Sequence, residues 1–537
     1  MRCHTIPYHR LPHPSKLFLA YVEEYSRVAR FYTHPPKLAA IRRVAGKLKF
    51  PGARRSEVAE VLREQNAAFG SGAATARHLK RLEKGAVTIV TGQQVGLFSG
   101  PAYAVYKALT AVAVAEELSR AGVVAVPVFW LATEDHDLDE IRAAHFFRQG
   151  RVASFELPAG AEGPRPVGRI PLGPEVETLV GQATEMLEGP GAQRLGEILR
   201  ASYRSGESYG SAFGKLFAGL FEEEGLILLD PLDARLHRIA APIYRQAIAE
   251  SAGLRAKLLR RGRELGRAGY AAQVKVAARS TLLFSLEAGF RRAITESGGA
   301  FQAGEKSYSR DALLQKAERA PETLSANALL RPVVQDFLLP TAAYVGGPAE
   351  IAYYPQAQVL YEELLGRMPV VLPRADFTLV DAKAAKILKR YAFSVEEIWA
   401  GKQEVRRRME LRSLPAALAK EFVRSAKGLD RALERLRRPI AKLDATLLGS
   451  LERARKASMF HLEKLQRKAG KARDLREGVL TAHEEHLLAL LYPNRATASR
   501  SLCLLPFLAT WGPEALGALK RLSVSKKLGA HQILFLD

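Results

Sequence analysis

The chain has 537 residues, of which 47% are apolar, and it carries a formal net charge of +24. Its length exceeds that of one ordinary hydrophobic core and predicts roughly two to four structural units, while the apolar fraction excludes an intrinsically disordered chain. Because it has no run of about eighteen apolar residues and begins without the apolar stretch of a secretory signal, a membrane protein is excluded and a cytoplasmic location is expected.

The two cysteines, Cys3 and Cys503, stand at opposite ends of the chain, and no CxxC spacing is present. This pattern excludes a disulfide framework and predicts no metal site. The positive charge is concentrated in residues 381–480, which contain 26 Lys and Arg against 13 Asp and Glu. Because this segment is also strongly helical, a solvated basic face is favoured over binding of nucleic acid or another polyanion, and attraction of small anionic substrates is a further alternative.

The first unit with a clear alternation of elements is residues 86–141. Residues 86–91 (AVTIVT) predict a buried strand, residues 102–122 a helix that ends at Gly122, and residues 123–133 (VVAVPVFWLAT) a second buried strand. This βαβ unit indicates an open parallel α/β sheet. Ligands of such sheets bind beyond the carboxyl ends of the strands, where both unusual loops of this unit are expected.

Further strands of the same sheet are predicted downstream. Residues 225–248 are expected to form a strand, an Asp-Pro loop and a helix, and residues 337–380 a strand, a Gly-Gly-Pro loop, a helix and a last strand. The intervening segments predict connecting insertions, with a small β-hairpin in residues 271–294. The expected boundaries are core residues 1–150, 206–250 and 326–385, insertions 151–205 and 251–325, helical residues 386–491, and a final segment 492–537 that returns to the core.

A heptad stripe follows the core, consisting of Leu433, Leu436, Ile440, Leu443 and Leu447. Pro439 is unfavourable inside a helix and Asp444 is a suitable N-cap, so we expect two long helices that turn near residues 440–446. A second stripe would pack against the first and consists of Met459, Leu462 and Leu465. Because two antiparallel helices leave apolar positions uncovered, this coiled-coil hairpin, roughly residues 414–491, is predicted to mediate homodimerisation.

Three glycines follow the first strand of the βαβ unit at a spacing of four, Gly92, Gly96 and Gly100. A Walker A loop is excluded because Gly100 precedes a proline and the nearest lysine, Lys107, falls inside the helix; the spacing also excludes GxGxxG. The glycines permit close backbone approach, the helix start favours an anion, and Gln93 and Gln94 supply neutral donors and acceptors. We interpret the loop as a cradle for an anionic substrate or phosphate, with a plain tight turn as the alternative.

An acidic cluster follows the second strand of the unit, Glu134, Asp135, His136 and Asp137. A carboxylate beside an imidazole can bias its tautomer and basicity, which predicts acid–base chemistry or binding of a substrate ammonium group. Helix capping is an alternative interpretation, and metal binding is a weaker one because a single His with two Asp lacks a second cluster of ligands.

A third polar stretch lies in residues 327–356, next to the Gly-Gly-Pro loop. Polar residues interrupt its apolar runs. They are Arg331, Gln335, Asp336, Glu350, Tyr354 and Gln356. Each alone is compatible with a satisfied structural group. Their combination near a predicted strand end indicates substrate binding.

Several stretches together resemble the BshC family, the cysteine-adding enzymes of bacillithiol biosynthesis. They are TGQQVGLFSGPAYAVYKA (91–108), PVFWLATEDHDLDEI (127–141), ALLRPVVQDFLLPTAAYVGGPAEIAYYPQ (328–356) and MPVVLPRADFTLVD (368–381), followed by the helical hairpin and LLYPN (490–494). The resemblance spans nearly the whole chain in the right order. It implies a Rossmann-like core with two connecting-peptide insertions and an α-helical coiled coil.

The same resemblance implies a carbon–nitrogen ligase that adds cysteine to glucosaminyl malate to form bacillithiol. Forming an amide from a free carboxylate is uphill in water, so ATP or another nucleotide is expected to activate the carboxyl, with Mg²⁺ as its companion. No standard nucleotide motif is present, and the missing HIGH motif argues against a copy of the class I synthetase mechanism.

In this interpretation the glycine loop holds an anionic group, while Asp135 and His136, with Asp137 beside them, orient or deprotonate the incoming amine. Two alternatives stay open. One is a non-catalytic scaffold or polyanion-binding protein built on the basic coiled coil, and the other is a related ligase that makes a different thiol.

Overall fold

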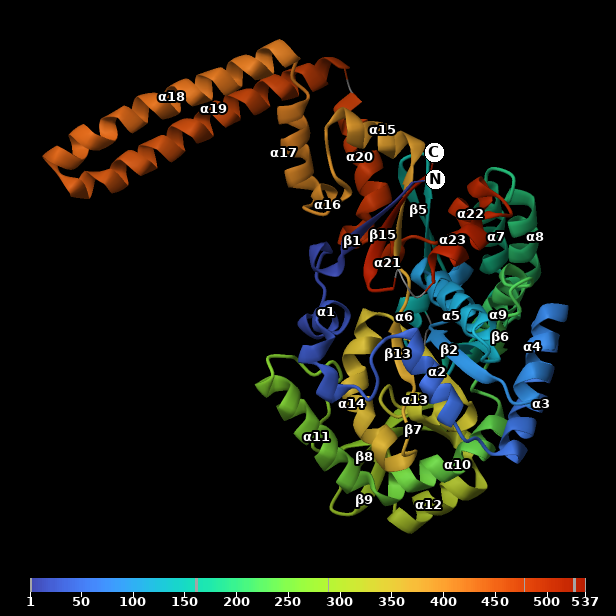
Figure 1. Ribbon diagram of the computed structural model, residues 1–537. Coiled ribbons are helices and arrows are strands. Elements are labelled where there is room, and N and C mark those ends of the chain that lie inside the picture. Colours follow the sequence, from blue (N-terminus) through green and yellow to red (C-terminus); the bar gives the residue numbers. More distant parts are fainter. Residues whose placement is uncertain (1, 160–162, 288, 478, 525–527, 537) are drawn as a thin grey trace.

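The computed structural model describes residues 2–159, 163–287, 289–477, 479–524 and 528–536. A globular body carries a long arm of two antiparallel helices that projects away from it (Figure 1). The first and last strands pair with each other, so the two ends of the chain lie side by side (Figure 1). Among the described residues, no helix combines the length and hydrophobicity needed to cross a membrane.

A five-stranded parallel sheet forms the centre of the body, in the order β13-β12-β2-β3-β6. Its strands are β2 (Val87–Gln93), β3 (Ala125–Leu131), β6 (Ile227–Leu229), β12 (Thr341–Gly346) and β13 (Val370–Pro373). From β2, the chain adds β3 and then β6 on one side. It then returns and adds β12 and β13 on the other side of β2. This doubly wound, Rossmann-like order confirms the predicted fold class and puts the switch point between β2 and β12.

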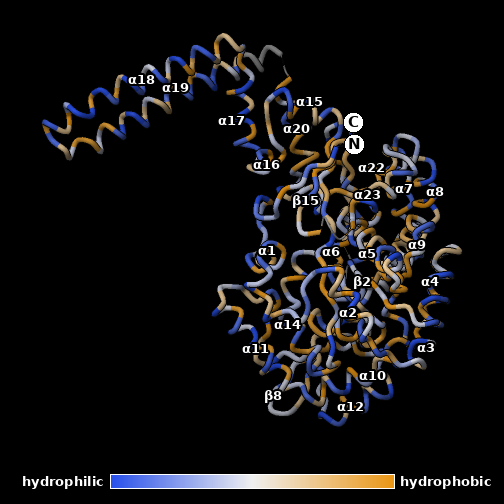
Figure 2. The backbone as a smooth tube through the Cα atoms, viewed as in Figure 1, coloured by the Kyte–Doolittle hydropathy of each residue, from blue (hydrophilic) through white to orange (hydrophobic). Residues whose placement is uncertain are grey.

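The helices that follow these strands cover both faces of the sheet. They are α5 (Tyr103–Arg120) after β2, α10 (Ala234–Ala249) after β6 and α14 (Pro348–Leu364) after β12. Neighbouring residues of β3 point to opposite faces: Phe129 packs in a core with α5 and α9 (Tyr209–Leu220), whereas Trp130 packs in a core with α10 and α14. Apolar residues are gathered inside the body, while they alternate with polar ones along the arm (Figure 2).

Two insertions extend the core. The first contains the β4 (Ala143–Arg148) and β5 (Arg151–Glu156) hairpin, α7 (Glu175–Glu185), α8 (Ala192–Ser202) and α9 (Tyr209–Leu220). The second contains α11 (Ser251–Arg267), α12 (Arg310–Arg319) and an antiparallel sheet of β7 (Ser280–Glu287), β8 (Phe290–Ser297), β9 (Ala300–Ala303), β10 (Lys306–Tyr308) and β11 (Leu324–Ala326). The predicted hairpin is therefore β7 and β8, and it belongs to a larger sheet than the sequence pattern indicated.

A small third sheet joins distant parts of the chain, with β15 (Ala530–Leu536) between β1 (Arg2–Pro7) and β14 (Phe377–Asp381). The expectation of a single strand in residues 368–380 was wrong, because β13 and β14 belong to different sheets. Between them Arg374 pairs with Asp376 at 2.6 Å, and Asp376 also faces His531 of β15 at 3.0 Å. Buried charges require partners, and these three side chains pair with one another at the point where the chain passes from the central sheet to the third sheet.

The remaining helices surround the core and support the arm. Before β2 they are α1 (Lys16–Glu23), α2 (Leu38–Lys47), α3 (Gly52–Ala68) and α4 (Ala73–Glu83). The others are α6 (Leu138–Ile141), α13 (Arg331–Leu338), α15 (Ala382–Arg390), α16 (Val395–Ile398), α17 (Lys402–Arg412), α20 (Val479–Leu491), α21 (Ala498–Ser501), α22 (Leu505–Trp511) and α23 (Ala515–Leu522).

The arm consists of α18 (Ala416–Leu443) and α19 (Leu448–Glu477), which contact each other along their length. The turn lies where it was predicted, and the Asp444 carboxylate accepts the Thr446 N–H at 2.8 Å. The expectation that Pro439 is excluded from the helix was wrong, since it lies inside α18. On this exposed arm, water can satisfy the carbonyl that the missing proline N–H leaves free.

Candidate active site

A cavity of about 680 Å³ opens at the carboxyl ends of β2, β3 and β12, where the strand order reverses. The start of α14 forms one side, and β7, β8 and α11 of the second insertion form the other. Several residues predicted from the sequence lie on its wall, namely Gly92, Gln93, Gln94, Glu134, Asp135, Arg331 and Glu350. The edge of the sheet expected to bind ligands therefore carries a cavity whose wall includes polar and charged side chains.

Lys107 lies at the floor of this cavity, although it sits in an otherwise apolar stretch of α5. Its side chain is 3% exposed and its ammonium contacts the Glu350 carboxylate. The same Nζ donates to the Gly92 carbonyl and to Gln93 Oε1, both at 2.8 Å. Burial alone would raise the pKa of Glu350, but the Lys107 ammonium lowers it below its usual value, so this is an ion pair that ties β2, α5 and α14 together.

The sequence patterns described above exclude Lys107 as a Walker A lysine, and its burial with an acidic partner was not predicted. The signal was present, because one lysine in a helix whose neighbours are nearly all apolar must be buried with a partner.

Three groups donate to Asp135, two from distant parts of the chain and one from the next residue. Gln94 Nε2 donates to it at 2.5 Å, Arg291 Nη1 of β8 at 3.2 Å and the His136 N–H at 2.8 Å. Burial would raise the pKa of Asp135, but the hydrogen bonds from His136 and Gln94 and the Arg291 guanidinium hold it well below its usual range. Asp135 is therefore an ionised anchor on the cavity wall.

Arg291 was missed, because it comes from the insertion and no local motif marks it. It is 8% exposed, and its other nitrogens donate to Ser325 Oγ at 3.2 Å and the Ala326 carbonyl at 3.0 Å. Each of its three guanidinium nitrogens donates a hydrogen bond within the protein, so Arg291 fixes the insertion against the core.

Positive charge exceeds negative charge on the cavity wall. The carboxylates are Glu134, Asp135, Glu140 and Glu350, and the cationic side chains are Lys107, Arg255, Lys275, Arg291, Arg331, Arg374 and Arg500. Arg331 donates to the Tyr353 hydroxyl at 2.9 Å and has no carboxylate partner among the described residues. Such a surplus on the wall of a cavity attracts anionic ligands.

Three buried polar atoms on the wall make no hydrogen bond within the described part of the chain, namely Gln94 Oε1, Trp130 Nε1 and Glu134 Oε1. A buried donor or acceptor without a partner costs free energy of about 1–3 kcal/mol. Donors and acceptors together on the cavity wall indicate a polar ligand with groups of both kinds.

Two family models cover almost the entire chain. Residues 1–375 match "Bacillithiol biosynthesis BshC, N-terminal Rossmann-like domain" and residues 377–536 match "Bacillithiol biosynthesis BshC, C-terminal coiled-coil domain". The chain belongs to the BshC family. The two models meet between β13 and β14, where the chain leaves the central sheet.

Relatives from three bacteria match over nearly their full lengths, and each bears the name "Putative cysteine ligase BshC". The protein of Koribacter versatilis is 39% identical over 94% of this chain and 95% of its own. Those of Solibacter usitatus and Salinibacter ruber are 36% and 33% identical and also cover at least 95% of both chains. The predicted family and the ligase class are thereby confirmed.

Within this BshC-family fold, two of the three loop glycines serve the turn and do not line the cavity. A Cβ built on Gly96 would lie 2.8 Å from the Gly100 Cα, and Gly100 has a φ of +63°. Both features require glycine for the backbone itself. Of the predicted cradle, the structure leaves Gly92, Gln93 and Gln94 on the cavity wall.

His136 and Asp137 also lie off the wall. His136 Nδ1 accepts from Arg291 at 3.0 Å, and the Asp137 carboxylate accepts the Glu140 N–H at 3.1 Å at the start of α6. Their acid–base roles stay a prediction. Within the described ranges, no group of three or more His, Cys, Asp or Glu is placed to hold a metal ion.

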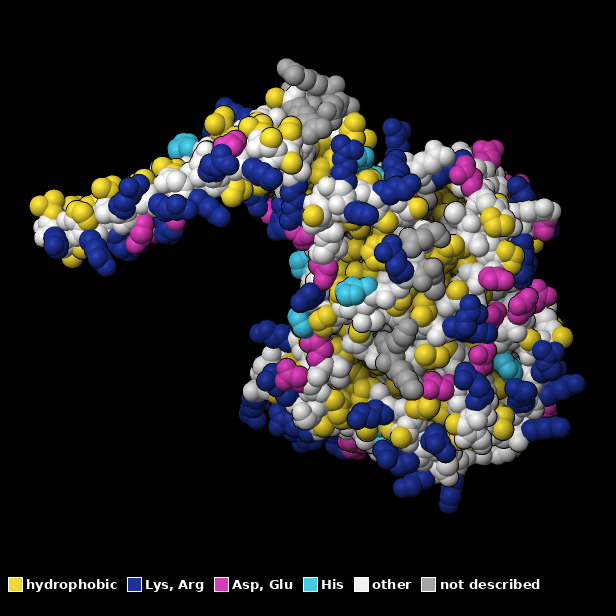
Figure 3. Space-filling view, turned by 45° about the horizontal axis from the view of Figure 1, so that its top comes forward, with side chains coloured by type: hydrophobic (Ala, Val, Ile, Leu, Met, Phe, Trp, Pro, Cys, Tyr) yellow, Lys and Arg dark blue, Asp and Glu magenta, His cyan; other side chains and the backbone are white. Residues whose placement is uncertain are grey.

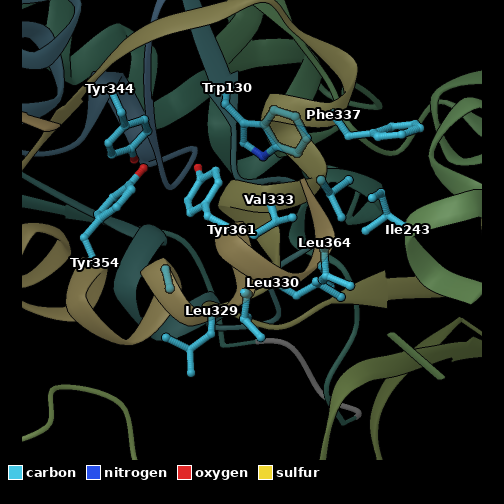
Figure 4. Packing of buried hydrophobic residues seen from close by; sticks show 14 of the residues in the cluster. Trp130, Ile243, Leu329, Leu330, Val333, Phe337, Tyr344, Tyr354, Tyr361 and Leu364 are labelled. Carbon is cyan, nitrogen blue, oxygen red and sulfur yellow. The ribbon is translucent and has the colours of Figure 1, made fainter. Parts of the chain in front are cut away.

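The remaining predicted residues are structural groups near the cavity. Gln335 and Asp336 are fully buried and bond to each other at 3.0 Å. Tyr354 lies among other tyrosines in the core (Figure 4). The Gln356 side chain forms hydrogen bonds with the backbone N–H and carbonyl of Val274, at 3.0 and 2.8 Å. It thereby holds residues 274–276, which line the cavity.

Proposed function

We propose that the protein joins the carboxyl of cysteine to the amine of glucosaminyl malate, which completes bacillithiol. The observation that carries this proposal is the cationic surplus on the cavity wall, in a chain of the BshC family. Glucosaminyl malate brings two carboxylates, and Arg331 with Arg500 offers positive charge on the cavity wall. The carboxylates of Glu134 and Asp135 then face the amine end of the same ligand.

We further propose that the carboxyl is activated by ATP or another nucleotide, accompanied by Mg²⁺. The residues present fit a polyphosphate by charge, with Arg331, Lys275 and Arg500 on the wall. Lys107 is already bound to Glu350, so it does not take the part of a P-loop lysine. A nucleotide would supply the leaving group on the carboxyl, while the chain's own residues bind and orient the amine.

Thiol profiling by mass spectrometry tests the proposed function. Cells that lack the protein should accumulate glucosaminyl malate and lose bacillithiol, and the wild-type gene should restore it. Unchanged thiols would contradict the proposal. Loss of a different thiol, with glucosaminyl malate unchanged, would point to a related ligase with another acceptor.

We also propose that the arm pairs with a second copy of the chain. Leu436 and Leu465 are 46% and 57% exposed, and hydrophobic side chains alternate with Lys and Arg along the arm (Figure 3). Apolar heptad positions that α18 and α19 do not cover for each other can be buried by a second hairpin.

The double variant L436E/L465E is expected to sediment as a monomer, whereas the wild type sediments as a dimer. Two charged side chains would have to be buried in the paired arms, which is strongly unfavourable. Val124→Glu is the matched control, because Val124 is equally exposed, at 55%, but lies on the body. A monomeric wild type, or a variant that stays dimeric, would contradict the proposal.

A further inference from the structure

Behind the cavity wall, Glu134 faces His237 from a different element. Glu134 lies in the loop after β3 and is 6% exposed, while His237 lies in the first turn of α10 and is 2% exposed. The distance from Glu134 Oε1 to His237 Nε2 is 3.4 Å. Neither atom makes a hydrogen bond within the described residues, although Glu134 lines the cavity. This pair is not used by the anchoring network of Asp135 and Arg291.

The surroundings keep this pair uncharged near neutral pH. Burial raises the pKa of Glu134 to about 8, and burial lowers the pKa of His237 to about 4. The charged or titratable groups that face Glu134 from the neighbouring elements are Asp135, Asp230, His237, Tyr244, Arg291 and Arg331. Because the attraction of the two arginines does not outweigh burial, Glu134 titrates near the pH at which an enzyme works.

The neighbouring candidates are less suited to accept a proton. Asp135 has a pKa well below its usual range, so its carboxylate is a weak base. His136 Nδ1 already accepts a hydrogen bond from the Arg291 guanidinium. Glu350 is neutralised by Lys107. An effective general base needs a free lone pair at the cavity and a pKa near the working pH.

We propose that Glu134 is the catalytic residue that accepts the proton of the amine substrate, and that His237 is a positioning residue that sets its basicity. In this step an N–H bond of the substrate ammonium breaks, the electron pair stays on nitrogen, and the proton passes to the Glu134 carboxylate. The free amine can then attack a carboxyl carbon. The inference rests on the proposed function, because it requires an amine acceptor in this cavity.

Glu134→Gln tests the catalytic part, because glutamine has the shape of the protonated carboxyl and cannot accept the proton. We expect kcat/KM for glucosaminyl malate, with cysteine and ATP in excess, to fall by about 10²- to 10⁴-fold near pH 8. The wild-type kcat/KM should rise with pH up to about 8 as Glu134 loses its proton, and fall at higher pH as the substrate ammonium loses its own. Glu134→Gln requires the free amine, so its kcat/KM should rise until the ammonium is deprotonated and then level off without a fall.

A matched control is Glu484→Gln, which makes the same change at a glutamate that is 3% exposed and pairs with Arg406 far from the cavity. It should leave the rate and its pH profile unchanged. A Glu134→Gln protein within about threefold of the wild type, or one whose kcat/KM falls at high pH as that of the wild type does, would overturn the proposal, because a structural role predicts the same pH profile for both proteins.

Titration calorimetry in buffers of different ionisation enthalpy provides a readout that needs no turnover. At pH 7 Glu134 is mostly protonated, and a bound ammonium favours its carboxylate form, so binding of glucosaminyl malate should release up to about one more proton from the wild type than from Glu134→Gln. Equal proton release would overturn the proposal. If the wild type forms no product, the proposed function fails, and the calorimetric difference still decides the inference about Glu134.

His237→Phe tests the positioning part. A phenyl ring keeps the bulk of the imidazole but offers no polar atom, so the protonated form of Glu134 becomes more favourable. The midpoint of the wild-type pH dependence should therefore move to higher pH in this variant. An unchanged midpoint would remove His237 from the proposal.

Discussion

Asp135→Asn should lower kcat/KM about a hundredfold while the protein stays folded. The variant removes the charge that holds Arg291 of the second insertion against the core, at 3.2 Å, and it removes the acceptor for Gln94. Reacting groups that are misplaced by about 1 Å lose on the order of a hundredfold in rate. Steady-state kinetics together with a thermal melt separate this effect from unfolding.

The matched control is Asp139→Asn, four residues along the same loop. Asp139 is 84% exposed and pairs with Arg142, an interaction worth about 0–1 kcal/mol at the surface, so its loss should leave the rate unchanged. If Asp135→Asn melts several degrees lower while its folded fraction turns over at the wild-type rate, the acidic cluster is a structural cap. His136→Asn should have a smaller effect than Asp135→Asn. If His136→Asn lowered kcat/KM as much as Glu134→Gln does, His136 would be identified as the general base.

Lys107→Met should destabilise the protein by about 3–5 kcal/mol, because it leaves the Glu350 carboxylate buried without its cation. The two side chains are 3% and 16% exposed, and Lys107 also satisfies the Gly92 carbonyl and Gln93 Oε1. Urea unfolding followed by tryptophan fluorescence measures the loss. Ligand-induced stabilisation should disappear as well, since Gln93 and Glu350 both lie on the cavity wall.

Lys215→Met is the control for this prediction. Lys215 pairs with Glu207, and the two side chains are 29% and 25% exposed, so water remains available to both. Its replacement should cost about 0–1 kcal/mol. The double variant Lys107→Met with Glu350→Gln should recover part of the lost stability, because it removes the unpaired charge. Equal costs for the two lysine variants would contradict the buried ion pair.

The sequence by itself determined the parallel α/β core and the edge at which ligands bind. The strands at residues 86–91 and 123–133, the Gly122 helix end and the Gly-Gly-Pro loop are local signals, since hydrophobic periodicity and turn chemistry depend on neighbours along the chain. The same holds for the helical hairpin and its turn at Asp444. For this reason the order of residues along the chain is sufficient to assign Gln93, Gln94, Glu134 and Asp135 to the site.

The tertiary structure alone decided which side chains meet at that edge. Arg291 reaches Asp135 across 156 residues of sequence, His237 reaches Glu134 from the helix after β6, and Lys107 finds Glu350 on a helix that follows another strand. A local pattern indicates that Lys107 is buried with a partner, but no local pattern identifies the partner in any of these pairs, because each pairing is set by the packing of an insertion or a neighbouring strand. Burial then decides the chemistry: the same acidic cluster contains a carboxylate that stays ionised at Asp135 and one that titrates near pH 8 at Glu134.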